Sequence, residues 1–489
     1  MEMLACELIN NQMFGGILMK DNPEKLPYQQ CKYRIADAAI IFPDGKEHQI
    51  NGELDIPYIV LKKDFDNEQY PFLSMTCTVS NKLYRKMKQY NDSLKFRLNM
   101  RYALFEKGAL AINAPNPDEH QFICKTFYLY LDDTSPSNQD NVMTEIEDHT
   151  QYGGYDDDVI DLNHSTVVRF SLYDGDAITV PKKLSKCVLH DVTLTDVITY
   201  KLRDIASFTK ILMTPADNNK RYDQFILPPE QLDYQIDRVA SEYNLHDNGT
   251  IFFFDFDRLY LTEKTNECTA WEPREVKRVY IISIPITKNE VLTTGAYYDS
   301  EANEIYLTTK SQTIEAISMA NEISSGSGIL VINKRTGKAE SFVIDGNKIK
   351  AAPKFTGKNK ETSIAYDKTI VINTGEDTIK ALKRRLNEKA IKWTVYLDAT
   401  MVDALKPNRE YEMVFTDPDQ AKKYNGTYRL VSVAAEFDVS MSDSKWRGVN
   451  TTATFLGYPN SSSNSTVANT LAGMSSMAST AMNLITGNR

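Results

Sequence analysis

The sequence predicts a β-rich α+β protein with several domains. Its 489 residues allow roughly two to four domains of ordinary size. It contains 27 tyrosines and 20 phenylalanines, and aromatic residues favour pleated, half-buried surfaces. Short apolar stretches separated by turn residues occupy most of the chain, whereas apolar residues at helical spacing are concentrated in the middle.

The first predicted domain, residues 1–133, has the pattern of a small β-barrel or sandwich. Apolar and polar residues alternate strictly over 94–100, which indicates a half-buried strand. Residues 81–90 have helical character, and a turn is expected at 43–46. Further strands are predicted at 33–42, 54–60, 72–79, 94–105 and 122–131.

The second predicted unit, residues 134–185, begins with an acidic, turn-rich stretch and continues with a strand over 166–172. We interpret 134–161 as a surface loop. Its carboxylates could supply oxygen ligands to Ca²⁺, but the order of an EF-hand loop is absent, so a solvated acidic loop is favoured. The carboxylates are those of Glu145, Glu147, Asp148, Asp156, Asp157, Asp158 and Asp161.

Residues 186–265 are predicted to form a helical connector that ends in an aromatic strand. A second helix is expected to begin at Pro228-Pro229, because proline is favoured in the first helical turn. Residues 251–261 are predicted to form one strand, covered on both faces in its first half. The first helix is predicted from one apolar face, made of Leu194, Ile198, Leu202, Ile205, Phe208 and Leu212.

The third quarter of the chain, residues 266–375, is predicted to be a domain of β-hairpins. Turns are expected at 299–303 and 334–337. Residues 376–459 are predicted to form a short basic helix over 376–390 and then a second β domain. Its strands are expected at 393–397, 410–416, 427–433 and 449–456.

The last stretch, residues 460–489, forms an uncharged tail in which Arg489 is the only charged residue. Two interpretations stay open: a flexible tail, or a helix that folds only against a partner or its own symmetry mates. The second makes the apolar residues near heptad spacing candidates for partner binding, namely Val467, Leu471, Met474 and Ile485.

Charge and hydropathy exclude several functional classes. The net charge of −10 opposes tight binding to nucleic acid, although it is compatible with DNA that passes without sticking. No apolar run approaches the ~20 residues that span a bilayer, and the N-terminus lacks a signal-peptide pattern, so no membrane insertion is expected. The six scattered cysteines are interpreted as buried free thiols.

Motifs for catalysis, cofactors and metals are absent from the sequence. It has no Walker A or dinucleotide-binding loop and no His-Glu-x-x-His, and its six histidines lack metal-ligand spacing, so loop histidines are expected. Residues 325–328 lack the order of a nucleophile elbow. Asp255 and Asp257, two apart on the predicted strand, could act as acid and base on a glycan or could form salt bridges with Arg258 or its neighbours. No catalytic, cofactor-binding or metal-binding residue is therefore assigned.

Two segments carry a resemblance to a known class of proteins. In the central segment, the residues Leu212–Asn218 lead to Pro228-Pro229 and then to Phe252–Leu261 with its Phe-Asp-x-Asp. It resembles the central hub proteins of contractile-tailed bacteriophage baseplates. In the closing segment, Gly426–Val431 leads to Phe437, Trp446 and Thr452–Leu456. It is similar to the tail-tube-like barrel of phage hubs and of the base of type VI secretion spikes.

The resemblance covers about a third of the chain and implies both an architecture and partners. It implies two tail-tube-like β-barrel domains per chain, in 1–133 and around 393–456. A homotrimer would then form a pseudo-hexameric ring between the six-fold tail tube and a three-fold central spike, and the genome DNA would pass through it. Implied partners are tail tube or tube-initiator proteins, the spike, the tape-measure protein and baseplate wedge proteins. The implied location is the virion tail, assembled in the bacterial cytoplasm.

Two alternatives rank below the hub. A tail-tip module could bind a receptor glycan on its aromatic hairpins, and a tail-associated enzyme could hydrolyse cell-wall glycan with Asp255 and Asp257.

Overall fold

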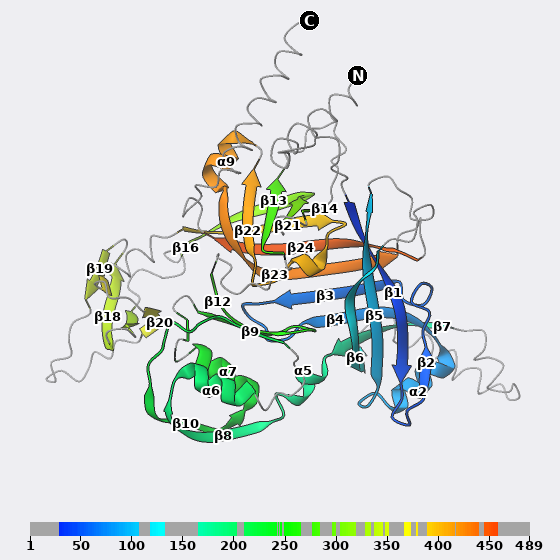
Figure 1. The fold of residues 1–489 in the computed structure, drawn as a ribbon, viewed down its shortest axis with the longest axis horizontal. Coiled ribbons are helices and arrows are strands. Elements are labelled where there is room, and N and C mark those ends of the chain that lie inside the picture. Colours follow the sequence, from blue (N-terminus) through cyan, green and yellow to red (C-terminus); the bar gives the residue numbers. More distant parts are fainter. Residues whose placement is uncertain are drawn as a thin grey trace, which may run out of the picture.

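Strands make up most of the described chain, which confirms the β-rich α+β class (Figure 1). The computed structural model describes residues 29–106, 118–132, 165–202, 210–241, 243, 245–246, 249–265, 276–283, 296–299, 304–318, 328–333, 337–345, 348–351, 366–372, 378–379, 389–415, 417–439 and 445–457. Within these ranges, no helix has the length and apolar character needed to cross a membrane.

Fifteen strands join in one large sheet, and its pairings close a first ring. In this ring β3 pairs with β4, and the order continues through β7, β6, β5, β1 and β24 to β23, which returns to β3. The strands are β1 (Gln29–Ile41), β3 (Tyr58–Asp64), β4 (Phe72–Ser80), β5 (Lys95–Glu106), β6 (His120–Leu131), β7 (Ser165–Tyr173), β23 (Gly426–Val439) and β24 (Arg447–Gly457). The short β2 (Glu47–Gln49) pairs with β1, and α2 (Asn81–Gln89) follows β4, as predicted.

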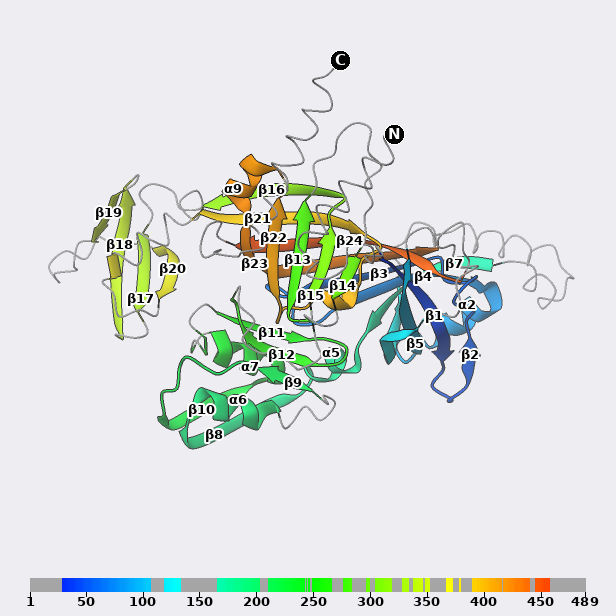
Figure 2. The same cartoon turned by 45° about the horizontal axis from the view of Figure 1, so that its top comes forward.

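A second ring uses three strands of the first. From β23 the pairing continues through β22 (Glu410–Phe415), β13 (Arg278–Ser283), β15 (Glu304–Thr308) and β14 (Ala296–Asp299). It then returns through β1, where Gln29 pairs with Ala296, to β24 and β23. Beyond β24 lie β21 (Lys389–Asp398) and β16 (Ser311–Ser318). The two rings are therefore fused along β1, β23 and β24 (Figure 2).

The seam between the rings is the point where β1 meets β24. Tyr33 pairs there with Arg447, and both side chains are almost fully buried. The Tyr33 hydroxyl donates to the Thr400 carbonyl (3.1 Å) and accepts from the Val402 amide (2.8 Å). These bonds tie β1 to the loop after β21 and to its short helix η3 (Val402–Ala404).

A smaller α/β unit lies on one side of the fused rings (Figures 1 and 2). Its helices α6 (Leu194–Leu202) and α7 (Leu232–Ser241) lie between a three-stranded sheet and a two-stranded ribbon. The sheet contains β9 (Ile211–Met213), β11 (Thr250–Phe254) and β12 (Leu259–Glu263), and the ribbon contains β8 (Leu184–Val192) and β10 (Tyr222–Gln231). The short helix α5 (Gly175–Thr179) precedes the ribbon.

The two predicted hairpins are confirmed, and they belong to different sheets. β14 and β15 are antiparallel within the large sheet. β17 (Gly328–Asn333) and β18 (Lys338–Asp345) are antiparallel in a separate four-stranded sheet with β19 (Lys348–Ala351) and β20 (Tyr366–Ile372). The range 266–375 thus contributes to two sheets, and the predicted domain boundaries stay predictions.

Both predicted helices of the middle region begin or end elsewhere. The first does not reach Leu212, which lies in β9, and 203–209 are outside the described residues. The second begins at Leu232, not at Pro228-Pro229. The two prolines lie in β10 where its register with β8 shifts, which proline tolerates because it has no amide to pair.

Three other expectations need correction. Leu54 lies in a turn, and the strand predicted from 54 begins at Tyr58. The helix predicted over 376–390 is seen at 378–379 in the described part, and β21 begins at Lys389. His246 is buried between Thr214 and Thr250, at 2.9 Å from each hydroxyl.

The free-thiol prediction is confirmed for the four described cysteines, but burial holds for only two. Burial raises the pKa of Cys31 and of Cys77 to about 12. Cys124 is exposed and Cys187 half-buried. The acidic segment 134–161 with its carboxylates lies outside the described residues, as do the tail residues Val467, Leu471, Met474 and Ile485.

Candidate functional site at the turn after the aromatic strand

The aromatic strand β11 belongs to two hydrophobic cores at once. Ile251 and Phe253 point into the core of the fused rings, whereas Phe252 and Phe254 pack in the core of the α/β unit. Successive strand residues face opposite sides, so this alternation covers both faces, as predicted. The ring of Phe254 stacks on Tyr70 at 4.7 Å between centroids. β11 is therefore the structural link between the two units.

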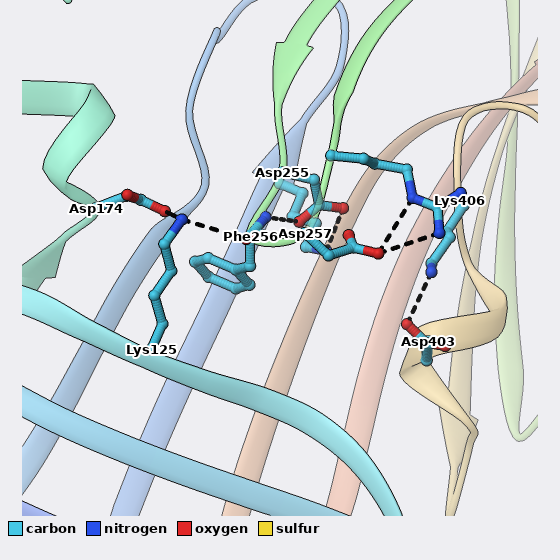
Figure 3. Close-up of polar contacts among 9 residues, drawn as sticks. Lys125, Asp174, Asp255, Phe256, Asp257, Asp403 and Lys406 are labelled. Carbon is cyan, nitrogen blue, oxygen red and sulfur yellow. Dashed lines mark hydrogen bonds and ion pairs between the residues drawn. The ribbon is translucent and has the colours of Figure 1, made fainter. Parts of the chain in front are cut away.

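Residues 255–258 form a tight turn, so the single strand predicted over 251–261 is wrong. The Asp255 amide donates to the Arg258 carbonyl (2.8 Å), and β12 pairs antiparallel with β11. The Asp255 carboxylate also accepts from the Phe256 amide (2.8 Å), a local bond that favours turns. Asp255 and Asp257 consequently do not share one face of a strand (Figure 3).

Each of the two carboxylates has its own cation. The Lys63 ammonium donates to both oxygens of Asp255 at 2.7 and 2.8 Å, and both side chains are under 10% exposed. Asp257 accepts from Arg258 at 3.1 Å and is 54% exposed. Partial burial would raise the pKa of Asp257, but Lys406 and Arg258 outweigh it and hold that pKa below its usual value. A general acid needs a raised pKa, and the lowered pKa of Asp257 does not fit that role.

Further charges hold the turn from both sides (Figure 3). Lys125 of β6 forms an ion pair with Asp174 and donates to the Phe256 carbonyl (3.2 Å). Burial raises the pKa of Asp174 in spite of Lys125. On the other side Lys406 pairs with Asp403 of η3 (3.0 Å), which holds the pKa of Asp403 below its usual value against the effect of burial. Lys63 of β3 and Lys125 of β6 therefore fix the turn to the first ring, and the charge of Lys406 attracts the Asp257 carboxylate.

A second ion-pair cluster connects the same two units. Asp66, just after β3, accepts two bonds from Arg429 of β23 (2.8 and 2.7 Å), and the Lys264 ammonium lies 3.1 Å away. Burial would raise the pKa of Asp66, but the two cations outweigh it and lower that pKa. The cluster therefore favours the ionised carboxylate in the folded state.

Asp66→Asn is expected to lower the free energy of unfolding at pH 7 by about 1–3 kcal/mol, the range for hydrogen bonds to charged groups. The pKa of Asp66 is lower in the folded than in the unfolded protein. The ionised carboxylate therefore stabilises the folded protein above the unfolded-state pKa of about 4, and this contribution is lost as the pH falls through the folded-state pKa. Urea unfolding across the acid range should thus show the gap between wild type and variant closing below about pH 4. Parallel curves would contradict the assignment.

Sequence reasoning found the two aspartates but missed Lys63, because it lies 192 residues from Asp255 and no local pattern connects them. Among the described residues, no group of three or more histidine, cysteine, aspartate or glutamate side chains could hold a metal ion.

Comparisons with known proteins place the chain in a family. Residues 29–477 match the model of a family described as the bacteriophage PBS1 gene 109 protein. A search of curated proteins gave no match. Solved structures with similar chains include a tail protein from Neisseria meningitidis MC58, with 10% identity and a TM-score of 0.42 over 88% of this chain and 97% of that one. Another is the 43 kDa tail protein of prophage MuSo2 from Shewanella oneidensis, with 11% identity and a TM-score of 0.38 over 87% and 96%.

A third structure is the lidded PdpA-VgrG complex of Francisella, with 10% identity and a TM-score of 0.42 over 88% of this chain and 53% of that one. The family match spans more than nine-tenths of the chain, from the first strand of the fused rings into the tail. It confirms the prediction of a bacteriophage protein, and the chain belongs to the family of the bacteriophage PBS1 gene 109 protein.

Proposed function

We propose that this chain is the central hub of a phage baseplate or tail tip and works as a homotrimer. In this proposal it connects the six-fold tail tube to a three-fold spike, and DNA passes through its channel. Its neighbours are the tube or tube-initiator proteins, the spike, the tape-measure protein and the wedge proteins. The protein is located in the virion tail.

The fusion of two strand rings in one chain is the observation that carries this proposal. Each copy provides two rings that share β1, β23 and β24, and their relative position is fixed by the Tyr33–Arg447 seam. Three copies would provide six rings, which is the number that a six-fold tube requires on its contacting face. A closed ring of identical copies uses a heterologous interface, in which two different patches meet.

The net charge of the chain supports a channel that does not bind the DNA. With a net charge of −10, the chain repels the phosphate backbone on average, and the Lys and Arg that phosphate binding requires are outnumbered by 66 acidic residues to 56 basic ones. A hub that lets DNA pass benefits from such weak interaction.

The proposed role is structural and not catalytic. The pair of aspartates that suggested hydrolysis is divided between two cations at a turn that joins two cores. These contacts support the proposal that the turn holds the two cores together.

The solution mass of the purified chain is expected to be about 167 kDa, three times the 55.6 kDa of one copy, because the proposed ring needs three copies. Light scattering coupled to size exclusion measures it directly. A chain that stays at the mass of one copy at high concentration, alone and when co-expressed with a tube or spike protein, would contradict the trimer.

A further inference from the structure

The ribbon of β8 and β10 has one face against the helices and one toward solvent (Figures 1 and 2). Its inward residues Phe225 and Leu227 belong to the core of the α/β unit. On the outward face, Leu184 is 77% exposed, Val188 51% and Ile226 59%. The ribbon thus presents large aliphatic side chains to water on a side that no other described element covers.

These exposed side chains form one patch with basic neighbours. Val188 and Ile226 lie directly opposite each other in the register, which brings their Cβ atoms within about 4.5–5.5 Å. Leu184 and Lys186 alternate with inward residues on the same strand, so they share the outward face with Val188, and Lys182 is exposed just before them. Val188 and Ile226 thus form an apolar pair, and Leu184 lies on the same face beyond Lys186. Exposed apolar side chains with polar neighbours are typical of a protein interaction site.

A second exposed aliphatic group has the opposite charge around it. Leu54 is 72% exposed at the tip of the turn between β2 and β3, between Glu53 and Asp55. Hydrogen bonds within the turn fix its shape: the Asn51 amide donates to the Asp55 carboxylate (2.9 Å), and the Asn51 side chain accepts from the Glu53 amide (3.0 Å). Leu54 therefore projects from a defined acidic turn.

The buried side chain of Arg447 also fixes the backbone of this turn. The Arg447 guanidinium, 2% exposed, donates to the carbonyls of Gly52, Ile56 and Pro57. A Cβ atom at Gly52 would lie 2.5 Å from that of Ile35, so the turn lies directly on β1. A side chain presented on a rigid turn loses little conformational entropy on binding, which favours Leu54 as a contact residue.

The two surfaces are complementary in chemistry. The turn 51–55 presents an aliphatic side chain between carboxylates, and the ribbon presents aliphatic side chains beside lysines. They cannot meet within one copy, because β2, which precedes the turn, and the ribbon lie at different sides of the molecule (Figures 1 and 2). We propose that the turn 51–55 of one copy docks its Leu54 on the ribbon patch of the next copy. The contact is heterologous, which is the kind that closes a ring.

This interface rests on the proposed trimeric hub, and the test separates the two. Leu54→Glu and Val188→Glu each place a carboxylate on an exposed apolar position, so each variant is expected to fold and to shift from trimer to monomer. Ile211→Glu is the matched control, since Ile211 is 45% exposed on β9, a strand that belongs to neither surface, and this variant should stay trimeric. Light scattering gives the mass, and circular dichroism checks the fold.

Mixing the two variants is the decisive experiment. A Leu54→Glu copy keeps an intact ribbon, and a Val188→Glu copy keeps an intact turn, so a mixture should form one native contact and yield heterodimers without trimers. A turn-to-turn or a ribbon-to-ribbon contact would not be rescued in this way. Trimers that persist in both single variants overturn the interface and leave the hub standing. A wild type that stays monomeric, alone and when co-expressed with a tube or spike protein, overturns the hub and this interface with it.

Discussion

Replacing Arg447 with methionine is expected to lower the free energy of unfolding by about 3–5 kcal/mol, because three backbone carbonyls lose a charged donor inside the protein. Burial lowers the pKa of Arg447 to about 10, so the guanidinium is still charged at neutral pH. Its acceptors are the carbonyls of Gly52, Ile56 and Pro57, and methionine fills much of the space without donating to any of them. Urea unfolding followed by circular dichroism measures the loss.

Arg221→Met is the matched control. Arg221 also makes bidentate contacts, to Asp191 at 2.9 Å, but both side chains are exposed, so little change is expected. If both variants lost the same stability, the effect at Arg447 would come from the loss of any arginine and not from its buried carbonyls.

The local parts of the fold were predictable because their signals are local. The alternation in the 12 residues of β5 and the helical character of the nine residues of α2 fix their type. The hairpin β17–β18 follows from two strand-like runs around a short turn. Sequence patterns of this kind identify strands but do not identify their partners.

The fusion of the two rings was not predictable, because it depends on pairing across the whole chain. β3 pairs with β23, so Leu61 lies opposite Ala435, and no pattern in either segment specifies the other. The resemblance implies two tail-tube-like barrels, in 1–133 and around 393–456, but it does not specify that β23 and β24 take part in both rings.

The candidate site also has one part with a local sequence signal and one part without. The contact of Asp257 with Arg258 joins neighbours in the sequence and is one of the two alternatives that the sequence leaves open. The Lys63–Asp255 pair has no such local signal. Leu54 shows a different failure. An apolar residue just before a strand has the pattern of that strand, although the bonds from the Asn51 amide to Asp55 and from the Glu53 amide to Asn51 place Leu54 at the tip of a turn.

Asp255→Asn is expected to lower the free energy of unfolding by about 3–5 kcal/mol, because it leaves the Lys63 ammonium buried without a counter-charge. The asparagine side chain still offers an acceptor to the Phe256 amide, so the turn itself is preserved. Adding Lys63→Met should recover most of the loss, since replacing both members of a buried ion pair is often close to neutral. Chemical denaturation of the two single variants and the double variant gives the coupling energy.

The same variants separate a structural pair from a catalytic one. Asp257→Asn is the control, because its carboxylate is 54% exposed and a small change in stability is expected. A hydrolase would respond differently: either aspartate variant would lose cell-wall-degrading activity while keeping its stability, and Lys63→Met would not restore that activity. If the turn has a structural role, we expect the double variant to recover its stability. We also expect the wild type to show no peptidoglycan-degrading activity. Both expectations follow from a carboxylate whose two oxygens are both engaged by one buried lysine.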